Sequence, residues 1–284
     1  LGLLPDKQWY NKFSENGIEP GEVSAQRKLE GFVPKVEAYS ANRDLPALAS
    51  TSTLSPHLHF GEVSPIMIWR EYQSINGSSP FLRQLCWRDF AHHLLFHFPQ
   101  TPEIPLREQF HSFWDTSDQS SLWSWQRGLT GYPLIDAGMR ELWRTGNMHN
   151  RVRMVVASFL VKNLGISWTA GANWFWQTLL DANLANNTLG WQWVSGCGAD
   201  AAPYIRIFNP VLQSERFDPE GHYIRRFIPE LSNLSKSEIH APWKVPNLVL
   251  LSKGVDLGKS YPLPIVDLDL SRNMALERFK LYKK

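Results

Sequence analysis

Two tryptophans, Trp191 and Trp193, stand one residue apart in the stretch LGWQWVSGCGAD, residues 189–200. Indole is readily oxidised, so such a pair suits electron chemistry, yet it also packs in an ordinary helical core. The chain holds 13 tryptophans in 284 residues, a content typical of carbohydrate binding, nucleic-acid stacking or flavin and haem photochemistry. On a helix the two side chains lie roughly 200° apart. One can therefore face a cavity while the other enters the protein body.

A run of five hydroxyl side chains stands just before Pro56. Its members are Ser50, Thr51, Ser52, Thr53 and Ser55. Hydroxyls and free backbone N–H groups at a helix start suit a phosphate or pyrophosphate, because the helix dipole already favours an anion there. A polar cap and turn would give the same pattern. The glycine-rich cradles GxGxxG and GxxxxGK[ST] do not occur, so neither of them can be the nucleotide site.

The stretch HNRVRMVVASF, residues 149–159, carries two arginines on a helical pattern. Asn150 and Met154 are four residues apart and share one face, with Arg151 and Arg153 beside them. An arginine held there against an apolar body can pair with a phosphate or with a buried carboxylate. Two ordinary surface arginines fit the pattern equally well.

The stretch DANLANNTLGWQW, residues 181–193, combines one carboxylate with several amides. Asp181 is followed by Asn183, Asn186 and Asn187. Amides read the edges of heteroaromatic rings because each offers a donor and an acceptor. Clustered asparagines near a helix end are also ordinary caps, so this signal is weak alone.

Metal and serine-hydrolase chemistry find little support in the sequence. The histidine pairs 57/59 and 92/93 lack helical metal spacing with nearby carboxylates, and no GxSxG turn occurs. The sequence therefore predicts no metal site.

The elements that position these residues belong to a globular chain. Hydrophobic residues make up 43% and charged residues 20%, and 284 residues suffice for one large domain or two modest ones. A net charge of +2 permits nucleic-acid binding without demanding it. Cys86 and Cys197 make no disulfide framework, and neither a membrane-spanning run nor a signal peptide is evident. These features predict a cytoplasmic protein that does not enter a membrane.

The periodicity predicts an all-α fold. Residues 1–21 read as an irregular leader, and helical periods dominate from Glu22 onward. Helices are predicted to open at Ser64–Pro65, to run over 79–98, and to end at Gly146 and Gly165. Long connections are expected around 99–120 and 196–222. The C-terminal tail is predicted to be an amphipathic helix.

Three separated stretches together carry a family resemblance. They are TGYPLIDAGMREL, MHNRVRMVVASFLVKNLGISW and LANNTLGWQWVSGCGADAAPYIRIFNPVLQSERFDPEG. They resemble the flavin domain of the photolyase/cryptochrome family, and within it class I cyclobutane-dimer photolyases most. The resemblance covers nearly the whole chain. It implies an all-helical FAD-binding catalytic domain at 22–284, preceded by a remnant of an interdomain linker at 1–21. It also implies that the family's N-terminal α/β antenna domain is missing from this chain.

The resemblance implies a bound FAD and assigns residues to it. Those matching the phosphate side are Tyr39, Thr51, Ser52, Thr53, Leu54 and Ser55. Phe81 falls at an aromatic position of the flavin pocket. Arg153 and Asp181 match an ion pair beside the ring, Asn183 lies near the ring, and Asn187 faces flavin N5. An amide at that place tunes the cofactor's electronics.

The resemblance further implies DNA containing pyrimidine dimers as the partner of a monomer. The positions around the flipped dimer are Arg43, Gln84, Trp87, Asn150, Arg151, Met154 and Trp193. Trp87 and Trp193 would stack on the dimer, and Arg43 and Arg151 would hold phosphates. On the other face, Trp191 would begin an electron relay through Trp168 to Trp114.

Three positions depart from the pattern of cyclobutane-dimer photolyases. Gln84 replaces a glutamate that contacts the dimer, so a proton donor is lost there and repair yield is expected to fall. Asn183 replaces an aspartate near the ring, and Asn147 replaces an aromatic residue before MHN. Six–four photolyases also use glutamine at position 84, but they have histidines where this chain has Asn150 and Met154.

The resemblance thus implies light-driven splitting of pyrimidine dimers by electron transfer from reduced FAD. The alternative is a cryptochrome-like photoreceptor in which flavin photoreduction through Trp191, Trp168 and Trp114 signals to a partner without repair. A helical relic that holds no flavin is a third reading.

Overall fold

The computed structural model describes residues 19–114 and 118–282. Within these ranges the regular elements are helices, apart from an isolated bridge between Leu257 and Tyr261. The all-α prediction is therefore confirmed. Of the predicted linker remnant, residues 1–18 lie outside the described part, and the chain becomes helical at Glu22 as expected.

The described helices are distributed along the whole of these ranges. The α-helices are α2 (Glu22–Phe32), α3 (Tyr39–Asn42), α4 (Ser55–His59), α5 (Pro65–Tyr72), α6 (Ser79–His97), α7 (Gln119–Arg127), α8 (Pro133–Thr145), α9 (Asn150–Ser158), α10 (Trp168–Thr178), α11 (Leu184–Ser195), α12 (Pro210–Phe217), α13 (His222–Phe227), α14 (Asn247–Ser252) and α15 (Leu268–Tyr282). Shorter turns are η1 (Val33–Lys35), η2 (Glu108–Phe110), the π-helical η3 (Phe159–Asn163), η4 (Pro229–Leu231) and η5 (Pro242–Lys244).

Local signals set several helix ends where the sequence predicts them. The Ser64 hydroxyl accepts a hydrogen bond from Met67 N at 3.1 Å, and Pro65 opens α5. Gly146 ends α8 in the left-handed region at φ 66°. The helix predicted to end at Gly165 instead widens into η3 before that glycine, so the last regular turn stops at Ser158.

The prediction of a long connection at 196–222 is wrong in part. An eight-residue helix, α12, occupies its second half. Asn209 caps this helix by accepting from Val211 N at 2.9 Å and Leu212 N at 3.2 Å, and Pro210 stands at its first position. These are ordinary signals of a helix start, which hydrophobic periodicity alone does not detect. The connection at 99–114 holds only the short turn η2 among the described residues.

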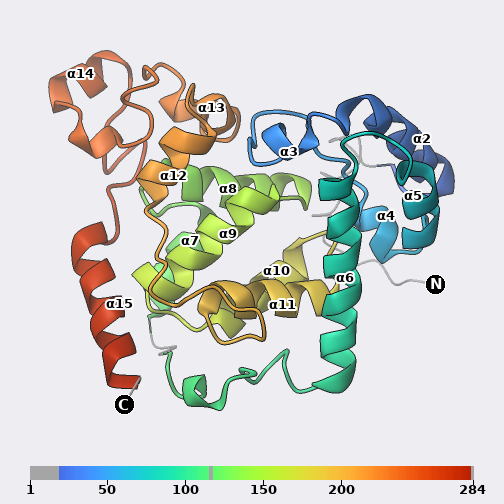
Figure 1. Cartoon of the computed structure of the whole chain (residues 1–284). Helices are drawn as coiled ribbons and strands as arrows, with labels where there is room; N and C mark the ends of the chain where they lie inside the picture. Colours follow the sequence, from blue (N-terminus) through green and yellow to red (C-terminus); the bar gives the residue numbers. More distant parts are fainter. Residues whose placement is uncertain (1–18, 115–117, 283–284) are drawn as a thin grey trace, which may run out of the picture.

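Two hydrophobic clusters organise the helices (Figure 1). The smaller one joins α2, α3, α5 and the start of α6 through residues such as Leu29, Phe32, Ile68 and Phe81. The larger one is built on α8 to α11, and α12 to α15 surround it. Helix α6 contacts α11 as well as α3 and α5, and so connects the two parts. The predicted site residues are divided between these parts, so the site must form where they meet.

Lys162 is a buried cation in the π-helical turn η3. Its side chain is in the buried core, its Nζ donates to Arg206 O at 2.7 Å, and it lies 5.4 Å from the centroid of the Tyr204 ring. Burial, with a smaller contribution from the Arg206 charge, lowers the pKa of Lys162 to about 7. An unfolded lysine titrates near 10.5, so the unfolded state binds more protons between these two values.

Stability is therefore expected to rise with pH across this window. From pH 7 to pH 9 the free energy of unfolding of the native chain should increase by about 2 kcal/mol relative to a Lys162→Met variant. Urea unfolding of both proteins at pH 7, 8 and 9 measures the difference. Parallel curves for the two proteins would contradict a neutralised lysine at this place.

Candidate functional site

An ion pair joins two of the predicted ring-side residues. Arg153 Nη2 lies 3.0 Å from both carboxylate oxygens of Asp181, and Arg153 Nε donates to Met148 O at 2.7 Å. Ser55 Oγ donates to Asp181 Oδ2 at 2.6 Å. Burial by itself would raise the pKa of Asp181, but the Arg153 charge and the Ser55 hydrogen bond outweigh it and hold that pKa below its ordinary value. Asp181 is therefore an anion in the folded protein at neutral pH.

The Ser55–Asp181 contact links the phosphate-side segment to the ring-side pair. These two residues are 126 positions apart in the chain. Ser55 opens α4, whereas Arg153 lies on α9 and Asp181 follows α10. The phosphate-side and ring-side residues that the resemblance assigns to one dinucleotide thus meet at a hydrogen bond.

The five hydroxyls do not act as one set. Ser50 is buried and donates to Asn42 O at 2.9 Å, so its hydroxyl is used inside the fold. Thr51 and Ser52 are half-buried, Thr53 is exposed and Leu54 is buried. Thr53 adopts φ 53°, and it is the single non-glycine residue of the described chain with a positive φ. A β-branched residue there is strained, and such strain is typical of ligand-binding turns.

Relief of that strain gives a stability prediction. Thr53→Gly is expected to raise the free energy of unfolding of the cofactor-free chain by about 1 kcal/mol, because glycine adopts this conformation without a steric penalty. Thr51→Gly is the matched control, since Thr51 has no positive φ, and it should lower stability by about 1 kcal/mol. Thermal and urea unfolding measure both. An equal loss in the two variants would show that Thr53 is unstrained.

Two of the amides have defined partners at the start of α11. Asn183 Oδ1 caps the helix by accepting from Asn186 N at 3.1 Å, and Asn183 Nδ2 lies 3.3 Å from His92 Nε2 on α6. The cap interpretation is therefore right for Asn183. Asn187 Nδ2 donates to Ala172 O at 3.0 Å, which fixes this side chain against α10. Its role toward flavin N5 stays a prediction.

The predicted aromatic residues of the cofactor pocket lie in the smaller cluster. Phe81 is 5% exposed, and its ring centroid lies 4.8 Å from Phe32, 5.0 Å from Tyr72 and 5.7 Å from Tyr39. The Arg43 guanidinium lies 5.3 Å from the Tyr39 ring centroid. Tyr39 therefore separates the buried Phe81 from the more exposed Arg43.

The expected substrate residues lie on α6 and α9. Trp87 on α6 is 43% exposed, whereas Gln84, one turn before it, donates from Nε2 to Pro80 O at 3.0 Å. On α9, Asn150 Nδ2 lies 3.9 Å from Met154 Sδ. The shared face predicted for Asn150 and Met154 is confirmed.

Arg151 is more firmly held than its sequence indicates. Its Nη2 forms an ion pair with Asp44 Oδ2 at 2.7 Å, and its guanidinium lies 4.3 Å from the centroid of the Phe217 ring. Arg151 Nε is buried without a hydrogen-bond partner in the described structure. A DNA phosphate would have to share this arginine with Asp44. The sequence gives no signal for that partner, because Asp44 lies 107 residues away.

The two tryptophans of the opening motif take different environments on α11, as predicted. Trp191 is 3% exposed, and its ring centroid lies 5.0 Å from Phe175 and 6.3 Å from Trp125. Trp193 is half-buried. A side chain on Gly171 would place its Cβ 2.1 Å from the Trp191 ring, so only glycine lets α10 approach this indole.

The other members of the predicted relay belong to the same large cluster. Trp168 is 1% exposed at the start of α10. Trp114 is half-buried, stacks on Phe110 at 5.8 Å with 21° between the rings, and lies 5.0 Å from Phe113. Electron transfer between the three tryptophans stays a prediction.

The residues present fit the dinucleotide that the resemblance implies. Arg153, Asn187 and the hydroxyls of the 51–55 segment offer donors, and Asp181 offers an acceptor. His57 Nε2 and His59 Nδ1, on α4, are buried without hydrogen-bond partners among the described residues. This segment thus retains polar groups that the fold itself does not satisfy, as expected beside a polar ligand.

Two kinds of feature are absent from the part of the chain that the structure describes. Within 19–114 and 118–282, no three His, Cys, Asp or Glu side chains gather closely enough to hold a metal ion. None of the helices in these ranges is both long and apolar enough to cross a bilayer.

Comparisons with known proteins agree with this geometry. The family model for the FAD binding domain of DNA photolyase matches residues 81–281. A deoxyribodipyrimidine photo-lyase of Agrobacterium fabrum is 48% identical over 99% of this chain and 60% of its own length. Cryptochrome-2 of Arabidopsis thaliana is 43% identical over 90% of this chain and 44% of its own length. The crystal structure of a bacterial class III photolyase from Agrobacterium tumefaciens superposes with a TM-score of 0.94 at 47% identity, covering 99% of this chain and 60% of that one. The chain thus spans about 60% of the length of these photolyases.

Proposed function

This chain belongs to the photolyase/cryptochrome family and contains its FAD-binding domain, and from that premise we propose that it serves light-driven repair of cyclobutane pyrimidine dimers in DNA. The observation that carries the proposal is the arrangement on α9. On the predicted cofactor side, this short helix presents Arg153 to Asp181, which also accepts from Ser55. On the predicted substrate side it presents Asn150 and Met154. One rigid element thus positions both partners of the reaction.

The cofactor would be held at its phosphates and at its ring. Thr51, Ser52 and Ser55 would bind the phosphates, while Arg153, Asp181 and Asn187 would contact the ring. Reduced FAD, when bound and illuminated, supplies a single electron to a dimer in contact with it. The side chains of this chain would orient the ring, hold Arg153 in place through its pairing with Asp181, and hold the dimer close.

The substrate side would bind a flipped-out dimer. A thymine dimer stacks and pairs poorly, so extruding it costs less than extruding a normal base. Trp87 and Trp193 would stack on it, with roughly 1–3 kcal/mol per base. Arg43 and Arg151 would bind phosphates on either side, so binding should weaken steeply with salt.

Gln84 determines whether the dimer can receive a hydrogen bond or a proton from this position. A glutamine there can donate a hydrogen bond to the dimer's carbonyls, but it cannot donate a proton. We expect Gln84 to leave Pro80 O when substrate arrives. Asn183 adds no charge near the ring. The class I likeness stays a prediction, since one solved relative is a class III enzyme.

The remaining features of the whole protein are proposed on the same premise. An N-terminal antenna domain would precede the linker remnant at 1–21, and the helical domain would extend over 22–284. The protein would be a cytoplasmic monomer whose partner is dimer-containing DNA.

A photoreceptor is the second candidate function. Gln84 satisfies its amide within its own helix at 3.0 Å from Pro80 O, and cryptochromes are among the relatives. In this case photoreduction through Trp191, Trp168 and Trp114 would alter contacts with a partner, and no dimer would be split.

One assay separates the two functions. Chemically reduced, FAD-loaded protein is illuminated with DNA that contains thymine dimers, and restored thymines are counted against a dark control. Restored thymines in excess of the enzyme support repair. Binding of the dimer without splitting would favour the receptor and reject repair.

A further inference from the structure

We propose that Gln192 is a positioning residue for the outer end of the tryptophan relay. It lies between Trp191 and Trp193 on α11, and it is 3% exposed. The proposal rests on the proposed function, because it assumes the predicted relay from Trp191 to Trp114 that carries flavin photoreduction in the second candidate function. Gln192 does not touch the cofactor-side residues named above, so it would act through the segment that carries Trp114.

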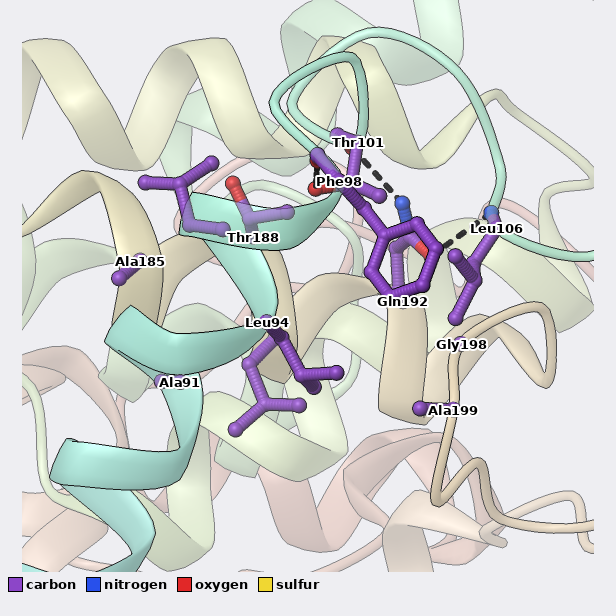
Figure 2. Close-up of a pocket in the computed structure, with 12 residues that line it drawn as sticks. Ala91, Leu94, Phe98, Thr101, Leu106, Ala185, Thr188, Gln192, Gly198 and Ala199 are labelled. Carbon is purple, nitrogen blue, oxygen red and sulfur yellow. Dashed lines mark hydrogen bonds between the residues drawn. The ribbon is translucent and has the colours of Figure 1, made fainter.

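The side chain of Gln192 binds three backbone groups of the connection between α6 and η2. Its Nε2 donates to Thr101 O at 2.7 Å and to Ile104 O at 3.1 Å, and its Oε1 accepts from Leu106 N at 3.1 Å. Figure 2 shows this amide reaching from α11 to Thr101 and Leu106. Both amide hydrogens are thus used, and this one side chain satisfies three backbone groups of the connection.

The main chain of Gln192 extends the same anchor. Its carbonyl accepts from Cys197 N at 3.1 Å and from Gly198 N at 3.2 Å. Cys197 O in turn accepts from Arg107 N at 3.0 Å, and Arg107 Nη1 lies 3.5 Å from Gly196 O. Leu106 is therefore fixed to α11 itself, and Arg107 is fixed to the turn that follows α11.

Trp114 follows this anchored point by seven residues. Between them, η2 places Phe110, 2% exposed, in the large core cluster. Trp114 stacks on Phe110, and the hydroxyl of Tyr282 donates to Ser112 O. Gln192 and Arg107 fix the start of this run, and Tyr282 and the aromatic rings hold its end.

The cavity beside Gln192 shows why an amide is needed there. It has a volume of about 20 Å³ and is lined mainly by apolar residues such as Ala91 and Leu94 of α6, together with Thr188 of α11. That space holds little more than one water, so solvent cannot replace three lost hydrogen bonds. Removing the amide would leave buried backbone groups unpaired, and the connection would move to satisfy them.

The test compares Gln192→Met with Thr188→Val in the FAD-loaded chain. Methionine keeps the volume and removes all three bonds, whereas Thr188 lines the same cavity and has no part in the anchor. Both are labelled with 5-fluorotryptophan, and Trp114→Phe assigns the Trp114 resonance in ¹⁹F NMR. Photoreduction under blue light and dimer splitting by chemically reduced protein are measured alongside.

We expect the Trp114 resonance to shift and broaden in Gln192→Met, with the Trp191 and Trp168 resonances unchanged. Photoreduction should fall about tenfold, because a displaced donor loses its productive geometry. Dimer splitting by chemically reduced protein and the FAD content should not change. Arg107→Ala, at an exposed site, should move the same resonance less.

Other outcomes overturn the inference. A Trp114 resonance that moves in neither Gln192→Met nor Arg107→Ala rejects the positioning role. Equal effects of Gln192→Met and Thr188→Val on this resonance would show that Gln192 is a general packing residue. Loss of FAD from Gln192→Met alone also makes it a general core residue. Photoreduction at the native rate in Trp114→Phe would show that Trp114 takes no part in electron transfer, so Gln192 would have no relay to position. Failure of the native protein to split dimers rejects repair only, since the resonance and photoreduction are read independently of it.

Discussion

Trp191→Phe is expected to lower the rate of flavin photoreduction by about tenfold or more, a barrier increase of at least about 1.4 kcal/mol. Trp191 is buried at 3% exposure, so no water or external reductant can take its place. Phenylalanine fills most of the same space beside Phe175 and Gly171 but is far harder to oxidise. Blue-light absorbance changes in the presence of an external reductant measure the rate.

The same variant should split dimers once its flavin is reduced chemically. Trp193, which is expected to contact the dimer, lies on the other side of α11 and is left intact. Trp125→Phe is a matched control, because this buried tryptophan also borders Trp191 and lies outside the predicted relay. Simultaneous loss of photoreduction and repair in Trp191→Phe would contradict the separation of the two faces.

Arg153→Leu is expected to lower the free energy of unfolding by about 3–5 kcal/mol. The change leaves the Asp181 carboxylate, with its side chain 8% exposed, without its bidentate partner. FAD should also be lost on dilution, because Arg153 is a predicted ring contact. Urea unfolding and the FAD absorbance after gel filtration measure the two effects.

A double variant distinguishes the ion pair from simple packing. Arg153→Leu combined with Asp181→Leu removes both charges and should recover part of the lost stability. Recovery of stability without recovery of FAD would assign the pair to the cofactor. If the double variant were as unstable as the sum of the two single ones, the two charges would not be coupled.

The lowered pKa of Asp181 predicts an acid sensitivity. A carboxyl with a depressed folded pKa stabilises the protein fully above its unfolded value of 3.8. That contribution is lost as the pH falls through the lower folded pKa. Below pH 4 the native chain should therefore lose stability relative to Asp181→Asn, which has no proton to bind. Unfolding curves that remain parallel down to acid pH would contradict the pair.

The sequence by itself determined the local structure well. The cap at Ser64, the proline that opens α5 and the glycine after α8 act through hydrogen bonds and dihedral preferences within a few residues. The opposed placement of Trp191 and Trp193 follows from helical geometry alone. The resemblance then assigned Arg153 and Asp181 to one ion pair, which the structure contains.

The contacts between distant segments were decided by the tertiary structure. Ser55 reaches Asp181, Arg151 pairs with Asp44, and Gln192 binds Thr101, at separations of 126, 107 and 91 residues. No spacing in the sequence encodes these partners, because each pair meets only after α6 and α9 to α11 have packed together. Local hydrogen bonds are specified by neighbouring residues, whereas these depend on how buried apolar faces bring remote backbone and side chains within about 3 Å. The family resemblance was therefore readable from the sequence, whereas the geometry of the predicted site was set by the packing of the core.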